Sequence, residues 1–191
     1  PRDLPAKKDF AAARRRFLFF SGGGNVHKGL DLLLEVFPRL DAELCVCQLL
    51  APQFREVYRK ELEDCPNIHY VGYVRMRSPE FYALADRCAY AILPSCAEGC
   101  VGSVVECMHQ GLVPVVSRES TVETGDYGIT LEDCTIESIA RTVAELANRP
   151  AEWCAEMCAR TRQAAITDFS EQAFLGNMKR ALQVILDGTH A

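Results

Sequence analysis

The sequence predicts an α/β protein: a Rossmann-like, doubly wound parallel sheet of about six strands with helices at its C-terminal end. Short apolar runs alternate with helix-length segments from residue 17 to about residue 130. Continuous apolar runs are typical of strands buried on both faces. Alternation with helices implies right-handed crossovers and parallel pairing. After Asp133 the pattern changes to helices only, which predicts a helical end to the same domain.

Each expected strand is an apolar run next to turn-forming residues. The first, residues 17–20, is followed by a glycine-rich turn, and the last is short. We expect strands at residues 17–20, 44–50, 68–74, 90–93, 112–116 and 128–130.

The expected helices show apolar stripes or end signals. Leu30, Leu33, Leu34 and Phe37 follow helical spacing, residues 53–63 form a polar helix, and residues 101–110 form a helix that stops at Gly111. The remaining start signals are Ser78, Thr135, Pro150 and Ser170, each before a helical pattern. The last helix carries the stripe Phe174, Met178, Leu182 and Ile185. This stripe either packs on the domain's own sheet or stays partly exposed for a partner.

Composition narrows the function classes. A net charge of -5 with no basic cluster beyond Arg14, Arg15 and Arg16 argues against a nucleic-acid surface, and we expect these three arginines to be solvated. The ten cysteines lie mostly in apolar runs, such as Cys45, Cys47, Cys88 and Cys107, which favours core thiols and a reducing, cytoplasmic compartment.

Several features are expected to be absent. No zinc site is expected at Cys154 and Cys158, because no His lies near them. No apolar stretch reaches the ~18 residues of a membrane span. The chain starts without Met and without a signal peptide, so we interpret it as a piece of a longer protein. Residues 1–16 would be a lead-in, and residues 17–191 a single domain.

The first candidate site is the glycine-rich turn after the first strand. Gly22, Gly23 and Gly24 let a backbone approach an anion, and Lys28 follows at the start of a helix, where free N–H groups favour negative charge. The spacing is not that of a P-loop or of a dinucleotide fingerprint. The alternative is a plain flexible turn with an exposed lysine.

The second candidate site spans the turn after the fourth strand. Glu98 precedes the next helix and Glu106 lies about one turn inside it, while the amides of Gly99, Cys100, Val101, Gly102 and Ser103 face the same space. Carboxylates accept hydrogen bonds from hydroxyl groups, and a diphosphate suits amides and Lys28. A nucleotide-sugar would satisfy all of these groups. The alternative is a solvated helix face.

The third candidate site is the end of the third strand, where Val74, Arg75 and Met76 could lie beside a flat base. The alternative is an ordinary strand end. In parallel α/β sheets ligands bind outside the carboxyl ends of the strands, which is where all three candidates fall.

These elements, in this order, resemble the C-terminal domain of GT-B glycosyltransferases of the retaining glycosyltransferase family 4. The marks are Lys28-Gly29, the segment 71–74, Pro94-Ser95 before Glu98-Gly99, Glu106, and the segment 111–116. The resemblance covers about residues 17–186 and implies one half of a GT-B fold.

The resemblance also implies roles for the candidate residues. Glu98 would contact the donor sugar, Glu106 the ribose hydroxyls, and Lys28 the diphosphate; Glu98 and Lys28 would be the catalytic pair. It further implies a nucleoside-diphosphate sugar as donor substrate, no metal and no other cofactor. The acceptor would bind to an N-terminal domain that is missing here, and any contact with the inner face of a membrane would come through that half.

Some positions depart from the family pattern. Gly23 and Gly24 stand where many relatives carry an arginine before the lysine, and Cys100, Val101 and Gly102 alter the loop after Glu98. Two other readings stay open: a GT-B-type epimerase or phosphorylase half, and a non-catalytic α/β interaction module.

Overall fold

The structure is a computed structural model that describes residues 8–188. Within that range a single parallel sheet runs in the order β3, β2, β1, β4, β5, β6. The order reverses between β1 and β4, so the sheet is doubly wound as predicted. The strands are β1 (Arg16–Phe20), β2 (Glu43–Cys47), β3 (Ile68–Tyr70), β4 (Tyr90–Leu93), β5 (Val113–Val116) and β6 (Ile129–Thr130).

Successive residues of the central strands pack into two core clusters, one on each face of the sheet. Phe17 and Phe19 of β1 belong to one buried cluster, whereas Leu18 and Phe20 belong to the other. The same alternation continues from Leu44 to Cys47 of β2 and from Tyr90 to Ile92 of β4, because successive side chains of a strand point to opposite faces. Burial on both faces explains why these strands are continuous apolar runs.

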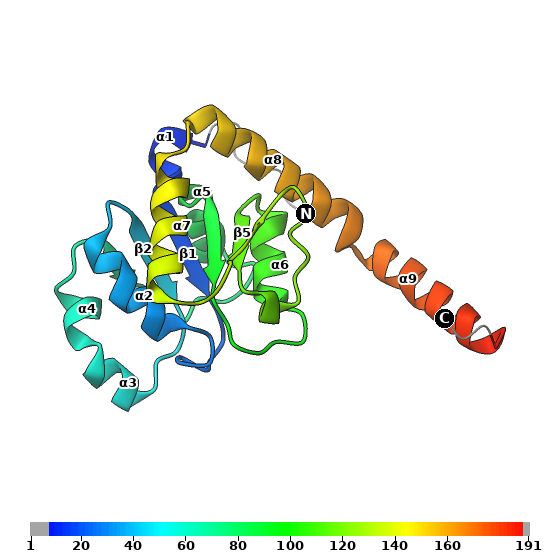
Figure 1. Ribbon diagram of the computed structural model, residues 1–191, viewed down its shortest axis with the longest axis horizontal. Helices are drawn as coiled ribbons and strands as arrows, with labels where there is room; N and C mark the ends of the chain where they lie inside the picture. The colour runs from blue at the N-terminus through cyan, green and yellow to red at the C-terminus, as the bar shows by residue number, and fades with distance from the viewer. Residues whose placement is uncertain (1–7, 189–191) are drawn as a thin grey trace.

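Helices cover both faces of the sheet (Figure 1). On one side α2 (Leu30–Val36) packs beside α7 (Ile136–Asn148), while Phe81 of α5 (Pro79–Arg87) and Cys107 of α6 (Gly102–His109) enter the opposite cluster. Helix α8 (Ala151–Asp168) crosses α6 and reaches β5. Short 3-10 turns lie at Phe37–Arg39 (η1) and Arg118–Ser120 (η2).

Most of the predicted helix starts are confirmed. The side chains of Ser78, Thr135 and Ser170 each accept a hydrogen bond from a backbone amide three residues on, which satisfies a free donor of the first turn. Gly111 ends the α6 segment with a left-handed φ of 77°.

Two predicted elements are shorter or split. Residues 53–63 form two helices, α3 (Pro52–Val57) and α4 (Arg59–Glu63), broken at Tyr58. The strand predicted over residues 68–74 ends at Tyr70, and Gly72 after it has a φ of 83°, which an extended strand does not accommodate. The strand predicted over residues 44–50 likewise ends at Cys47.

The described part of the predicted lead-in, residues 8–16, packs against the rest of the chain. Helix α1 (Phe10–Ala13) packs on α8, and Ala13 is buried. Residues 1–7 lie outside the described range. Residues 8–16 therefore belong to the domain that follows them.

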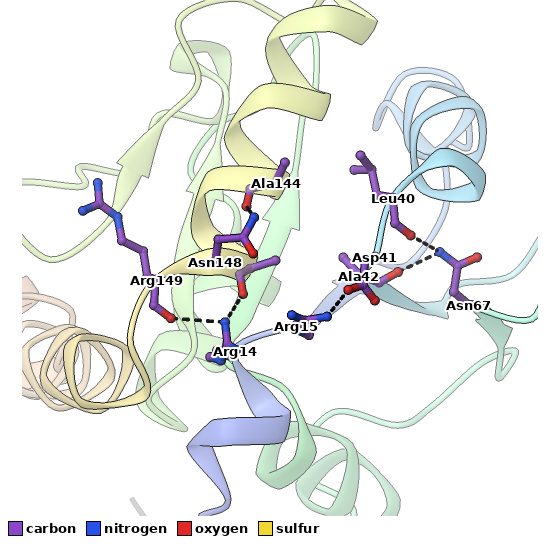
Figure 2. A network of polar contacts seen from close by, with 10 residues as sticks. Arg14, Arg15, Leu40, Asp41, Ala42, Asn67, Ala144, Asn148 and Arg149 are labelled. Atoms are coloured by element: carbon purple, nitrogen blue, oxygen red, sulfur yellow. Dashed lines mark hydrogen bonds and ion pairs between the residues drawn. The ribbon is translucent and has the colours of Figure 1, made fainter.

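The three arginines at the start of β1 are paired rather than simply solvated, and Figure 2 shows the contacts of the first two. Arg14 donates to the carbonyl oxygens of Ala147 and Arg149 at the end of α7, where a cation complements the helix dipole. Arg15 pairs with Asp41, and Arg16 Nε lies 2.9 Å from Glu43 Oε2. They tie the start of the sheet to neighbouring segments.

Helix α9 (Glu171–Leu186) extends away from the body of the molecule (Figure 1). None of its described residues is buried, and its apolar stripe is exposed, from 44% at Met178 to 73% at Ile185. The alternative of packing on the domain's own sheet is therefore wrong for this stripe.

The cysteines Cys45, Cys47, Cys88 and Cys107 are buried free thiols, as predicted, and so are Cys154 and Cys158. In residues 8–188 no helix combines the length and apolar character that crossing a membrane requires.

Candidate functional site

The candidate site lies at the carboxyl edge of β1 and β4, the point where the strand order reverses. Phe17 pairs with Tyr90 and Leu18 with Ala91, so the turn after β1 and the turn after β4 emerge side by side. The backbone amide of Cys96 donates to the carbonyl of His27 at 3.0 Å and joins the two turns directly. Adjacent strands thus bring residues about 70 positions apart in sequence to one place.

The glycine-rich turn is held at Asn25 by hydrogen bonds to the loop after β2. Asn25, buried, donates from Nδ2 to Gln48 Oε1 at 2.6 Å and to the carbonyl of Leu49 at 3.1 Å, and its Oδ1 accepts from the amide of Ala51 at 3.0 Å. This side chain fastens the turn to the loop after β2. The preceding residues of the turn, Gly22, Gly23 and Gly24, are exposed to solvent.

Gly29 brings the end of this turn against the neighbouring strand. Its φ of 74° is left-handed, and a Cβ there would lie 2.3 Å from the carbonyl oxygen of Pro94. Only glycine allows both the conformation and the approach. The contact fixes where Lys28, the preceding residue, sits.

Lys28 and Glu98 form an ion pair across the two turns. Their side chains are 17% and 11% exposed, so the pair is largely withdrawn from water. Ser95 Oγ lies 2.7 Å from Glu98 Oε1 and 3.1 Å from the carbonyl of His27, while His27 Nε2 lies 3.7 Å from Glu98 Oε1. Several donors therefore converge on one carboxylate oxygen.

The electrostatics of Glu98 follow from these contacts. Burial raises its pKa, but hydrogen bonds from Lys28 and Ser95, together with the charge of Lys28, outweigh that effect and hold the pKa below the ordinary value. Glu98 is thus ionised at neutral pH, and Lys28 is its counter-ion. Ser95 is one of the residues that carry the family resemblance, but its hydrogen bond to Glu98 was not predicted from the sequence.

Glu106 lies one turn inside α6, as predicted, but it does not join the Lys28 pair. It is buried and accepts two hydrogen bonds from the guanidinium of Arg77, one of them at 2.8 Å between Arg77 Nε and Glu106 Oε2. The pair lines a cavity of about 550 Å³ together with Tyr82, His109 and Phe169. Arg77 was missing from the predicted site because no local pattern indicates a contact between residues 29 apart.

The amides predicted to face a ligand lie at the start of α6. Val101 is the N-cap and makes no side-chain capping bond, so the first-turn amides are not satisfied by a side chain at that position. Cys100, exposed, has a left-handed φ of 80°, which is unusual for a residue other than glycine. Gly99 and Gly102 are exposed and Ser103 is half-buried.

Two predicted contact residues are turned inward. The side chains of Val74 and Val101 are buried in the core, so only their backbone groups can meet a ligand. Arg75 and Met76 are exposed beside them, in the coil that follows β3. Contact with a base stays a prediction, in which Arg75 and Met76 would offer accessible side chains and Val74 only its backbone.

A second cavity, of about 460 Å³, is lined in part by Gly29 and Pro94. It is lined by Asp31, Cys96, Ser117 and Glu132 among others. The candidate site therefore consists of the carboxyl edge of the sheet and the two cavities near it.

The fold and the position of the site define a Rossmann-like α/β domain of the kind found in GT-B glycosyltransferases. The sequence profile described as "Glycosyl transferases group 1" matches residues 14–149. The chain belongs to this family. A search of curated proteins finds no match.

Solved structures show the same fold. HepE from Anabaena, in complex with UDP and glucose, superposes with a TM-score of 0.72 at 14% identity, over 91% of this chain and 49% of HepE. A TarM variant from S. aureus, in a complex that includes UDP, gives 0.74 at 18% identity, over 94% of this chain and 37% of TarM. The chain thus spans half or less of the length of these two proteins.

A shorter solved chain also matches. The catalytic domain of cholesterol-α-glucosyltransferase from Helicobacter pylori gives a TM-score of 0.64 at 12% identity, over 81% of this chain and 98% of that one. At these identities the likeness shows the fold alone.

Proposed function

We propose that this chain is the C-terminal, donor-binding half of a retaining glycosyltransferase that transfers a sugar from a nucleoside-diphosphate sugar to an acceptor. The observation that carries the proposal is the pairing of Lys28 with Glu98 at the reversal point of the sheet. In this architecture ligands bind at that point. Group 1 glycosyltransferase membership and the UDP in HepE and TarM support a nucleotide-sugar as the ligand.

Lys28 has three N–H donors, and Glu98 takes one of them in the structure. The others can bind the diphosphate when the donor substrate enters. As the bond to the sugar breaks, negative charge grows on the departing diphosphate, and a positioned cation lowers the energy of that state. We assign this role to Lys28 and to the first-turn amides of α6, with no metal and no other cofactor.

Glu98 is held as an ionised acceptor by Lys28 and Ser95. In this proposal its carboxylate accepts hydrogen bonds from the donor sugar and faces the positive charge that develops on the sugar ring, which is consistent with retention. Glu106 accepts the ribose hydroxyls. The exposed backbone of Gly22, Gly23, Gly24, Gly99 and Gly102 lies close to the diphosphate and the sugar.

The acceptor binds to a further, N-terminal half in this proposal. Its support is that the chain spans 49% of HepE and that α9 exposes Phe174, Met178, Leu182 and Ile185 with no partner in residues 8–188. Any membrane contact belongs to that half. The free thiols of all ten cysteines, which lie within the described range, support a reducing, cytoplasmic location.

Ligand-detected NMR or calorimetry with UDP, GDP and ADP tests the proposal. We expect the 191-residue chain to bind one of them weakly and to transfer no sugar by itself. Lys28→Ala should abolish the binding, whereas the exposed Arg59→Ala should leave it unchanged. Folded protein that binds none of the three contradicts the proposal. A whole protein whose product forms without an acceptor places it among the epimerases instead, and one that turns over a sugar phosphate places it among the phosphorylases.

A further inference from the structure

Arg77 and Glu106 form an ion pair with two hydrogen bonds. The guanidinium donates through two nitrogens to both carboxylate oxygens, so the carboxylate is held in one orientation. The side chain of Glu106 is 12% exposed, whereas that of Arg77 is 68% exposed. Arg77 therefore lies over the buried carboxylate from the solvent side.

The backbone at Arg77 supports this placement. Arg77 has a φ of 61°, in the left-handed region where glycine or asparagine is the usual residue. The amide of Ser78 donates to the carbonyl of Arg75 at 3.1 Å, and Ser78 Oγ caps α5 by accepting from the amide of Phe81 at 3.2 Å. The turn is thus fastened to a helix, and it carries a long side chain at a strained position.

Other charged or titratable groups lie around the Arg77–Glu106 pair, and the charge of His109 has a smaller effect on the Glu106 pKa than Arg77 has. His109, one turn further along α6, directs Nε2 to the carbonyl of Phe169 at 3.3 Å. Tyr82 of α5 and Glu171 at the start of α9 line the same cavity. The hydrogen bond from Arg77 is the largest influence on the pKa of Glu106, which lies below the ordinary value despite burial.

A carboxylate offers about four acceptor positions, and Arg77 uses two. The remaining two lie on the outer sides of the two oxygens and point apart, so each can accept one hydroxyl donor, such as the 2′- or the 3′-hydroxyl of a ribose. We infer that Arg77 is a positioning residue for ribose recognition: its two hydrogen bonds hold the Glu106 carboxylate in the orientation in which a free position of that carboxylate accepts a ribose hydroxyl. This inference rests on the proposed function, since it assigns a further residue to the same donor site.

The test measures ribose preference in the 191-residue chain. The best binder among UDP, GDP and ADP is compared with its 2′,3′-dideoxy counterpart, and the preference is the ratio of the two Kd values. Arg77→Ala should lower the preference about ten-fold, as the loss of an oriented, charged hydrogen-bond acceptor implies. Arg77→Gly should lower it equally, because glycine relieves the strain but also removes the guanidinium. Arg77→Lys should retain part of it.

Two further variants separate positioning from packing. Glu106→Gln should lower the preference, and adding Arg77→Ala to it should lower it no further, because both act through one carboxylate. Arg141→Ala, which breaks an exposed arginine–glutamate pair with Glu132, is the matched control and should leave the preference unchanged.

Each remaining outcome overturns the inference. A preference that survives both Arg77→Ala and Arg77→Gly, while Glu106→Gln loses it, overturns the role of Arg77 and leaves the proposed function standing. A difference between the alanine and glycine variants assigns the effect to the backbone turn. Tighter binding by Arg77→Ala makes Arg77 a competitor of the ligand. If the wild-type chain binds none of the three nucleotides, the proposed function fails and this inference falls with it.

Discussion

Gly29 touches the carbonyl of Pro94 so closely that a Cβ on Gly29 would lie 2.3 Å from that oxygen. This contact locks the turn after β1 against the turn after β4. The two turns carry Lys28 and Glu98, so the geometry of the candidate site depends on a residue without a side chain.

Gly29→Ala should therefore disrupt both the fold and the site. The methyl group meets a backbone oxygen and the residue has a positive φ, so we expect a loss of about 2–4 kcal/mol in the free energy of unfolding. Urea denaturation measures it. Gly22→Ala is the matched control, since a Cβ at Gly22 has nothing within 4 Å, and its loss should stay below ~1 kcal/mol. Equal losses in the two variants would show that the contact is unimportant.

Lys28→Ala should destabilise the protein in a pH-dependent way. It leaves the largely buried Glu98 without its cation, which we expect to cost on the order of 2–3 kcal/mol at pH 7, less than for a fully buried pair. The folded pKa of Glu98 is depressed, so its contribution is present above the ordinary glutamate pKa and is lost as pH falls through the folded pKa. Urea denaturation at pH 7, 5 and 3.5 should show the gap between wild type and variant closing in that order.

In the same series of urea denaturations at different pH, Glu98→Gln removes the charge of the side chain but keeps its shape. It keeps an acceptor oxygen without the charge, so its stability loss should vary less with pH than that of Lys28→Ala. A Lys28→Ala gap that widens on acidification would contradict the ion-pair account.

Lys28→Ala should also lower the rate of sugar transfer by the whole protein. If Lys28 stabilises the departing diphosphate, kcat should fall by about 10²-fold or more, as when a single preorganised donor is removed. Steady-state kinetics with the nucleotide-sugar measure it. An unchanged kcat would mean that the α6 amides suffice.

Asn67→Asp should be far more harmful than Asn148→Asp. Asn67 Nδ2 faces the carbonyls of Phe37 and Ala42 at 2.7 Å and of Leu40 at 3.1 Å, so a carboxylate there would confront three acceptors. Figure 2 shows the contacts with Leu40 and Ala42. We expect a loss of about 2–4 kcal/mol at pH 7 from unpaired, repelling oxygens. Asn148 is exposed and, among residues 8–188, its side chain donates to the Ala144 carbonyl alone, so its change should cost about 0.5 kcal/mol.

The pH dependence of the Asn67→Asp variant follows from its carbonyl neighbours. They raise the pKa of the new carboxyl group, so the destabilisation is present at neutral pH and shrinks as the group is protonated on acidification. Thermal or urea unfolding of both variants between pH 7 and 4 provides the readout. A constant difference between Asn67→Asp and wild type over this range would show that the new carboxylate is not held against the carbonyls.

Polar substitution on α9 should not affect the stability of this chain. Leu182→Ser and Ile185→Ser remove side chains that are already exposed, so the free energy of unfolding should change by less than about 0.5 kcal/mol. Ile139→Ser on α7, which is fully buried, should cost about 2–5 kcal/mol. In the whole protein the α9 substitutions should become destabilising. Their remaining silent there would count against a docked N-terminal half.

The apolar pattern predicted the sheet well because a strand that is buried on both faces needs apolar residues along its whole length. The strand at Tyr90–Leu93 has the bounds that the sequence indicates, and Ser78, Thr135 and Ser170 cap helices where expected. Predictions failed where a backbone conformation intervened. Gly72 turns the chain out of β3, and the helix predicted over residues 53–63 breaks at Tyr58.

The sequence by itself determined the fold class, the strands and the two turns that hold Lys28 and Glu98, because burial and glycine act locally along the chain. Only the tertiary structure decided which charged groups meet. Lys28 contacts Glu98 because β1 and β4 are neighbours in the sheet. Arg77 contacts Glu106 of α6 because Arg77 has a left-handed backbone conformation, which directs its side chain toward that helix. An ion pair between distant residues depends on strand order and on single φ values, which no pattern of residue types expresses.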